Sequence, residues 1–289
     1  MRYNISHSLT YSYGKPVFLE PHTVRLRPRC YSLQQVIRFE LDVVPTPQGV
    51  SEHIDQECNN AATLWFNGQH RTLSISAKSE VEVLPAKPFN YIVTENDFLN
   101  LPVTYSQSCQ YQLQPYLSRR YESSQIDDFV QPITKEAKGE TISFLVRLAS
   151  FIHEQCDIVM RETGAPMAPE KTIAKRKGTC RDLAVLFMEC CRAVGLAARF
   201  VSGYRWDEDL AEKHTLHAWS EVYIPGGGWQ GFDPIIGLAA TDRHIAVAAA
   251  ANPVDAAPVS GTFRGTGIHC KLEYDVSICL SQEIHKANG

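Results

Sequence analysis

Apolar and polar residues alternate along most of the first 95 residues, which is the pattern of strands that bury one face. The alternation runs through residues 3–13, 35–44 and 72–84, and a shorter apolar run covers 62–66. Proline and glycine separate these runs and are typical of turns. We therefore expect residues 1–98 to form an antiparallel, sandwich-like β domain.

The alternation stops at about residue 99. Residues 99–139 contain Pro102, Pro115 and Pro132 among many polar residues. Because proline interrupts both helices and strands, this segment is predicted to be an irregular connection with a short helical turn.

From Thr141 the period becomes that of a helix with one buried face. Its apolar stripe is formed by Ile142, Leu145, Val146, Ala149, Ile152 and Cys156. A second helical stripe follows Cys180, and strand-like runs then cover 197–204, 217–224, 229–233 and 269–278. This order predicts an α+β core over residues 140–289, and the last strands are candidates for a return to the N-terminal sheet.

Cys180 stands at the first position of the second helix. Thr179, followed three residues later by Asp182, fits a capping box in which Thr179 is the N-cap. A thiol at this position faces free backbone N–H groups and the positive end of the helix dipole, which favour the thiolate. Arg181 adds to the expected lowering of the thiol pKa and Asp182 opposes it. An isolated cysteine at a helix start, however, is more often a small core residue.

A histidine and an aspartate lie on the two strands of a predicted hairpin around Pro225–Gly228. A four-residue loop would point His217 and Asp233 to opposite faces. A three- or five-residue loop would instead set Asp233 opposite Trp219 and diagonal to His217, within side-chain reach. We predict the odd-length loop. His214 is the competing histidine, and it is expected to face solvent.

Composition narrows the class of protein. A net charge of −4 and a pI near 6.2 give no electrostatic reason to bind nucleic acid or an anionic membrane. Residues 1–7 lack the features of a signal peptide and no apolar run has the length of a membrane span, so the cytoplasm is the expected location. Nine irregularly spaced cysteines suit a reducing compartment. Without a paired metal-binding motif, we expect neither a metal nor another cofactor.

Four motifs of the second half occur in order, namely Gly178–Ala184, Arg199–Tyr204, His217–Trp219 and Gly228–Pro234. Together they resemble the transglutaminase-like superfamily in its bacterial form, which carries its own N-terminal β domain. The resemblance implies a papain-like α+β core in which Cys180 is the nucleophile, His217 the base and then the acid, and Asp233 the group that orients the imidazole. Chemical reasoning from the three residue types assigns the same roles.

Such a triad implies thiol-dependent acyl transfer at amide bonds, with a peptide or protein as the substrate. Water as the acceptor gives a protease or amidase, and an amine gives a transglutaminase; hydrolysis is preferred because no amine site is identifiable. A non-catalytic peptide-binding module on the same fold is the alternative of a different class. Trp219, Trp229 and Tyr204 are the expected substrate contacts, and an acidic loop at 207–212 could favour cationic substrates, although a solvated loop is the simpler interpretation. The second oxyanion donor and the oligomeric state stay open.

Overall fold

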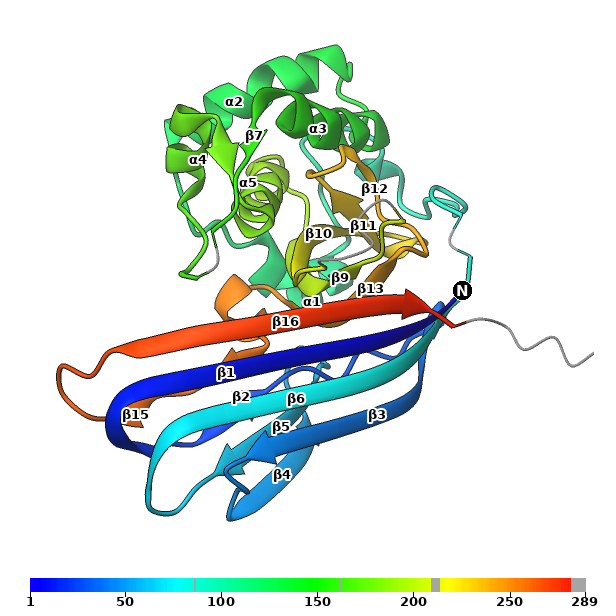
Figure 1. Cartoon of the computed structure of the whole chain (residues 1–289). Coiled ribbons are helices and arrows are strands. Elements are labelled where there is room, and N and C mark those ends of the chain that lie inside the picture. The colour runs from blue at the N-terminus through cyan, green and yellow to red at the C-terminus, as the bar shows by residue number, and fades with distance from the viewer. Residues whose placement is uncertain (86, 162, 209–213, 282–289) are drawn as a thin grey trace, which may run out of the picture.

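The N-terminal half of the protein is a sandwich of two antiparallel sheets (Figure 1). The computed structural model describes residues 1–85, 87–161, 163–208 and 214–281. The larger sheet consists of β1 (Arg2–Leu19), β3 (Gln34–Val44), β6 (Gln69–Val83), β15 (Phe263–Arg264) and β16 (Cys270–Leu280). The smaller consists of β2 (His22–Val24), β4 (Gly49–Ile54), β5 (Asn60–Trp65) and β14 (Val259–Ser260). Buried aliphatic side chains of β1, β6, β2 and β5 fill the space between the sheets, as the alternating pattern predicted.

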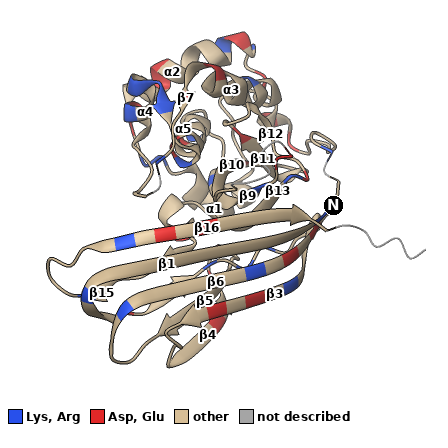
Figure 2. Ribbon diagram, in the orientation of Figure 1, with Lys and Arg blue, Asp and Glu red and all other residues tan. Residues whose placement is uncertain are grey.

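The C-terminal strand belongs to this N-terminal sheet. β16 runs antiparallel to β1 over its whole length, from Tyr3 opposite Leu280 to Tyr13 opposite Cys270. Along β16 and the neighbouring strands, charges of opposite sign lie close together (Figure 2). The pairs Lys271–Glu273 and Arg2–Glu80 are examples, at 2.7 and 3.6 Å.

The second half is an α+β unit built on a five-stranded antiparallel sheet. In spatial order its strands are β12 (Leu238–Ala239), β11 (Gly228–Asp233), β10 (His217–Ile224), β9 (Ala198–Arg205) and β13 (His244–Ala250). The helices α2 (Ser124–Glu136), α3 (Thr141–Gln155), α4 (Pro169–Lys175) and α5 (Cys180–Ala193) cover one side of it (Figure 1). The remaining elements are α1 (Gln107–Leu117), the 3₁₀ turns η1 (Asn96–Phe98) and η2 (Pro253–Ala256), and the short parallel pair β7 (Asp157–Ile158) and β8 (Lys177–Gly178). The α5 helix is central, because almost all of its residues are buried.

The prediction of an irregular connection over 99–139 is wrong, since α1 and α2 occupy most of it. Both helices contain a proline, Pro115 near the end of α1 and Pro132 in the last turns of α2. Each helix has formed enough turns before the proline for the lost hydrogen bond to be tolerated. The spacing of Ile126, Val130 and Ile133, which are all buried, was the helical signal.

The apolar stripe predicted for α3 is partly wrong. Val146 is 40% exposed, whereas Phe144 and Leu148 are fully buried. Because α3 packs against α2, α5 and the end of the core sheet, its buried face is wider than the single stripe of a surface helix.

The two halves meet along β13, an edge strand of the core sheet. The side-chain amide of Gln34 donates to the carbonyl of Ala246 and accepts from its N–H, at 2.8 and 2.9 Å. Asn59 makes the same two contacts with Ala249, at 2.9 and 2.8 Å. The backbone N–H of Arg29 also donates to the Ala246 carbonyl, at 3.0 Å. The two side chains and this N–H together satisfy backbone groups on the exposed side of an edge strand.

Among the residues that the structure describes, no helix is both long enough and apolar enough to cross a membrane.

Candidate active site

The N-terminus of α5 presents the thiol of Cys180. Thr179 is the N-cap, and its backbone N–H and hydroxyl both donate to the Asp182 carboxylate at 2.9 Å. The capping box expected from the sequence is thus present. The other oxygen of Asp182 accepts from the Arg161 guanidinium at 2.6 Å, so the negative charge beside the thiol is compensated.

A close approach behind the thiol explains the glycine that precedes this cap. A Cβ on Gly178 would lie 2.9 Å from the Cβ of Asp182 and 3.1 Å from Leu183. Any larger side chain would therefore push the first turn of α5 away from β8.

The β10–β11 hairpin has the odd-length loop that the sequence predicted. Ile224 pairs with Gly228 and Ser220 with Phe232, which leaves a three-residue loop and sets Asp233 next in register opposite Trp219. This parity places the side chains of His217 and Asp233 on the same face of the sheet. The predicted register is confirmed.

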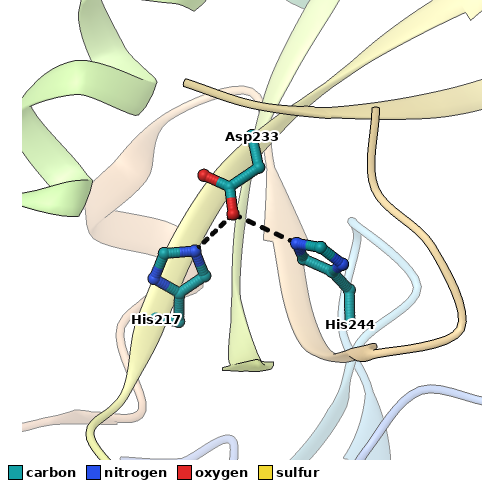
Figure 3. Close-up of side chains that lie close together, drawn as sticks. All are labelled: His217, Asp233 and His244. Carbon is teal, nitrogen blue, oxygen red and sulfur yellow. Dashed lines mark hydrogen bonds and ion pairs between the residues drawn. The ribbon is translucent and has the colours of Figure 1, made fainter. Parts of the chain in front are cut away.

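His217 and Asp233 are joined by a short hydrogen bond (Figure 3). His217 Nε2 lies 2.7 Å from Asp233 Oδ2, and the Asp233 side chain is fully buried. The other carboxylate oxygen, Oδ1, accepts from the backbone N–H of Ile235 at 2.9 Å. Although burial alone would raise the pKa of Asp233, the two neighbouring histidines hold it well below its usual range.

Cys180 is partly exposed as a residue, and its thiol is hydrogen-bonded to the His217 side chain. Since Nε2 of that imidazole faces Asp233, Nδ1 is the nitrogen left for the sulfur. Burial raises the pKa of the thiol, but His217, the backbone N–H of Ala218 and the charge of Arg181 together lower it below its ordinary value. The arrangement therefore favours a thiolate.

His217 is the matching cation. Burial disfavours the imidazolium, but the Asp233 carboxylate and the Cys180 sulfur outweigh this effect and raise the pKa of His217 to about 10. Between the lowered pKa of Cys180 and the raised pKa of His217, the favoured state is a thiolate–imidazolium pair.

A second histidine, His244, lies on the other side of the same carboxylate (Figure 3). Its Nε2 is 3.1 Å from Asp233 Oδ2. The ligand atoms of His217, Asp233 and His244 lie within 4.8 Å of one another, a spacing that could also hold a metal ion. The two hydrogen bonds to Oδ2 account for the cluster without one. Sequence reasoning missed His244, since it follows a turn and carries no motif.

Two of the three expected substrate contacts are buried side chains, which corrects those predictions. Tyr204 is 1% exposed and bonds to His7 of β1 at 2.9 Å, between the two halves of the protein. Trp219 is 2% exposed. Its ring stacks on that of His217, with 6.1 Å between the ring centroids, and lies edge-on to that of His244, with 5.2 Å between them.

Trp229 is half-buried at the far end of β11. The guanidinium of Arg199 lies over its ring at 4.2 Å, and Tyr116 packs against it edge-on. Its contact with substrate stays a prediction.

His214 was expected to face solvent and is instead 9% exposed. It forms an isolated β-bridge to Val276 of β16, so burial between the two halves removes it from competition for the base. Most of the acidic loop predicted at 207–212 lies outside the described residues.

Comparison with known proteins finds relatives of both halves of the chain. Residues 127–234 match the transglutaminase-like superfamily, and residues 3–82 match the bacterial transglutaminase-like N-terminal region. A protein of Cytophaga hutchinsonii, described as a candidate cysteine protease, has the same fold with a TM-score of 0.69. It is 21% identical and covers 96% of this chain and 98% of its own.

Relatives with similar sequences include mycobacterial proteins of uncharacterised function. One from Mycobacterium leprae is 25% identical over 273 residues, which are 92% of this chain and 94% of that protein. A human peptide-N(4)-(N-acetyl-beta-glucosaminyl)asparagine amidase is 46% identical over 57 residues, which are 20% of this chain and 7% of the amidase. With both regions in order and the whole fold shared, the chain belongs to the transglutaminase-like superfamily, in the form that carries a bacterial transglutaminase-like N-terminal region.

Proposed function

We propose that this protein transfers acyl groups from amide bonds of peptides or proteins through a thioester on Cys180, with water as the usual acceptor. The observation that carries the proposal is the chain of contacts from the helix-terminal thiol to His217 and on to the buried Asp233. A nucleophile, a proton carrier and a group that orients the carrier are the parts that such chemistry needs.

The first half of the reaction forms the thioester. The Cys180 thiolate attacks the carbonyl carbon of the amide, and a carbon–sulfur bond forms. His217 gives its Nδ1 proton to the amide nitrogen as the carbon–nitrogen bond breaks and the amine departs. Backbone N–H groups at the start of α5 are available by position as donors to the developing oxyanion.

The second half releases the acid and restores the thiolate. The now neutral His217 removes a proton from water, and the oxygen attacks the thioester carbonyl. The carbon–sulfur bond breaks, the carboxylic acid leaves, and His217 again pairs as a cation with the thiolate. A primary amine in place of water would yield a new amide, which is the transglutaminase outcome.

Hydrolysis is preferred over transamidation because the site offers no recognisable amine pocket among the described residues. The name of the human relative, an amidase, supports the same choice. A silent binding module would not need the three polar residues, and their retention disfavours that alternative.

Alkylation at low pH tests the activated thiol. Iodoacetamide at pH 6, followed by mass mapping, should label Cys180 roughly tenfold or more faster than the exposed Cys30 and Cys279, because only thiolates react. Cys180→Ala should lose the fast phase, whereas Cys30→Ala should keep it. Equal labelling of Cys180 and the exposed thiols would remove the proposed function.

Trapping of the acyl-enzyme tests the reaction itself. Wild-type protein is mixed with a peptide library at low pH and quenched, and the mass of the Cys180 peptide is measured. If the acyl mass on Cys180 is lost during further incubation in buffer and the free acid appears, hydrolysis is supported. If the acyl group is transferred to an added primary amine, the transglutaminase is supported. No adduct on Cys180, with a reactive thiol shown by alkylation, would favour the binding module.

A further inference from the structure

Asp233 Oδ2 is shared by two imidazoles that come from different strands. His217 on β10 approaches it at 2.7 Å and His244 on β13 at 3.1 Å (Figure 3). The His244 side chain is 3% exposed, so it is almost entirely shielded from solvent. The reaction steps proposed above give it no role.

The hydrogen bonds of His244 determine which of its nitrogens carries the proton. The backbone N–H of Thr241 points at His244 Nδ1, with a distance of 3.1 Å. A backbone N–H can only donate, so Nδ1 accepts and carries no proton. The proton of the neutral ring is then on Nε2, which is the atom that faces the carboxylate.

The surroundings of His244 keep it neutral. It faces Asp233 from β11, His217 from β10 and Arg205 from β9, and the Trp219 ring packs edge-on against it. Burial lowers the pKa of His244 below its ordinary value, and the charges of His217 and Arg205 act in the same direction against the opposing effect of Asp233. Because His244 is a neutral donor, it does not neutralise the negative charge of Asp233. That charge therefore remains available to stabilise the His217 cation.

We propose that His244 is a positioning residue that holds Asp233 Oδ2 toward His217 by donating an Nε2 hydrogen bond to it. The inference rests on the proposed function of the Cys180 site. The backbone N–H of Ile235 donates to Oδ1 and His244 donates to Oδ2. Each carboxylate oxygen thus has a donor other than His217, which restrains rotation of the carboxylate about its terminal bond. His217 is thereby held with Nδ1 toward the sulfur.

The protonation state of His244 is tested directly on the wild-type protein. Histidine ¹⁵N spectra across pH 5–8 should show the His244 ring neutral with its proton on Nε2 and, in the same protein, His217 as a cation. Assignment comes from His244→Gln and His217→Gln. A cationic His244, or one protonated only on Nδ1, at neutral pH would overturn the proposal.

Two substitutions test the positioning role. His244→Phe keeps the ring volume and removes the donor, whereas His244→Gln keeps an amide N–H near the position of Nε2. In His244→Phe the pKa of Cys180 should rise, which lowers its alkylation rate about threefold or more at pH 6 and little at pH 9. His244→Gln should recover most of the rate. A folded His244→Phe protein with the wild-type pH profile would refute the positioning role.

The outcomes separate the two proposals. If Cys180 of the wild-type protein is no more reactive than Cys30, the proposed function fails, whatever the spectra show for His244. If wild-type Cys180 is reactive and only the effect of His244→Phe is missing, the function stands and the positioning role falls. If His244→Phe does not fold by circular dichroism, the spectra and the His244→Gln profile decide.

Discussion

At the scale of single residues, Asp233 is a carboxylate with no solvent exposure that nevertheless stays ionised. Burying an unpaired charge would cost several kcal/mol, roughly. Here His217 and His244 donate to Oδ2, and the Ile235 N–H donates to Oδ1. Full pairing is the physical reason that the sheet can hold a charge in its interior.

Asp233→Asn is expected to uncouple the thiol from the histidine. Without the carboxylate, only the Cys180 sulfur still opposes the effect of burial on His217, and the pKa of His217 should fall from about 10. The Cys180 thiolate is then no longer stabilised by a His217 imidazolium, and alkylation of Cys180 at pH 6 should slow about tenfold or more. Asp128→Asn on the exposed side of α2 is the matched control, and an unchanged rate in both variants would contradict the expectation.

The His217–Asp233 pair makes the free energy of unfolding depend on pH in a predictable direction. The folded pKa of His217 is raised, so its contribution is complete below the unfolded value of about 6.5 and is lost as pH rises toward 10. Asp233 is shifted downward, so its contribution is present above about 3.8 and is lost as pH falls. The stability difference between wild type and Asp233→Asn, measured by urea unfolding, should be largest between about pH 4 and 6.5. A difference that grows towards pH 10 would contradict it.

At the scale of elements, the core sheet depends on one close approach between β9 and its neighbours. A Cβ on Gly203 would lie 2.2 Å from the carbonyl oxygen of Ile245 on β13 and 2.7 Å from the Trp219 ring on β10. Glycine is needed here for space, since the strand passes directly against both neighbours. That approach lets Trp219 pack beneath the two histidines.

Gly203→Ala should therefore destabilise the protein by about 1–3 kcal/mol, because backbone and a ring must move to admit the methyl group. Urea unfolding measures this change. Gly14→Ala is the matched control, because its Cβ would meet nothing closer than 3.8 Å. It should change stability by less than about 1 kcal/mol. Equal effects of the two substitutions would show that space at Gly203 is not limiting.

At the scale of the whole molecule, the long N-terminal sheet serves both halves. Part of its apolar face packs on the smaller sheet, and another part, with Tyr3, Ile5 and Val81, packs on Ile245 and Val247 of β13. Gln34 and Asn59 seal the edge of the same strand. Since His244 begins β13, the N-terminal half supports the strand that carries one donor to Asp233.

Gln34→Ala is expected to weaken this junction. It removes the partner of the buried Ala246 N–H, whereas the Ala246 carbonyl keeps its hydrogen bond from the Arg29 N–H, so the loss should cost about 1–3 kcal/mol. Gln35→Ala, one residue later and exposed, should stay within about 0.5 kcal/mol of wild type. Urea unfolding followed by tryptophan fluorescence measures both, and similar values for the two variants would argue against the role of Gln34.

Local patterns were sufficient for much of the fold. Alternation located β3, β6 and β16 to within a few residues and the first part of β1, which continues to Leu19, because a strand with one buried face repeats every two residues. The helices α1 and α2 were missed because their prolines outweighed a short apolar spacing. The buried face of α3 was misjudged because that face depends on how many neighbours the helix has.

The sequence by itself determined which residues are the candidates, Cys180, His217 and Asp233. It also determined the capped helix start that holds the thiol and the loop parity that turns His217 and Asp233 to one face. Each depends on residues a few positions apart, and so the chain specifies it locally. Only the tertiary structure decided that His244 joins Asp233 and that Trp219 and Tyr204 are buried. Those outcomes depend on the order of the strands in the core sheet and on how the two halves pack together. The free energy that selects this arrangement is spread over the whole core.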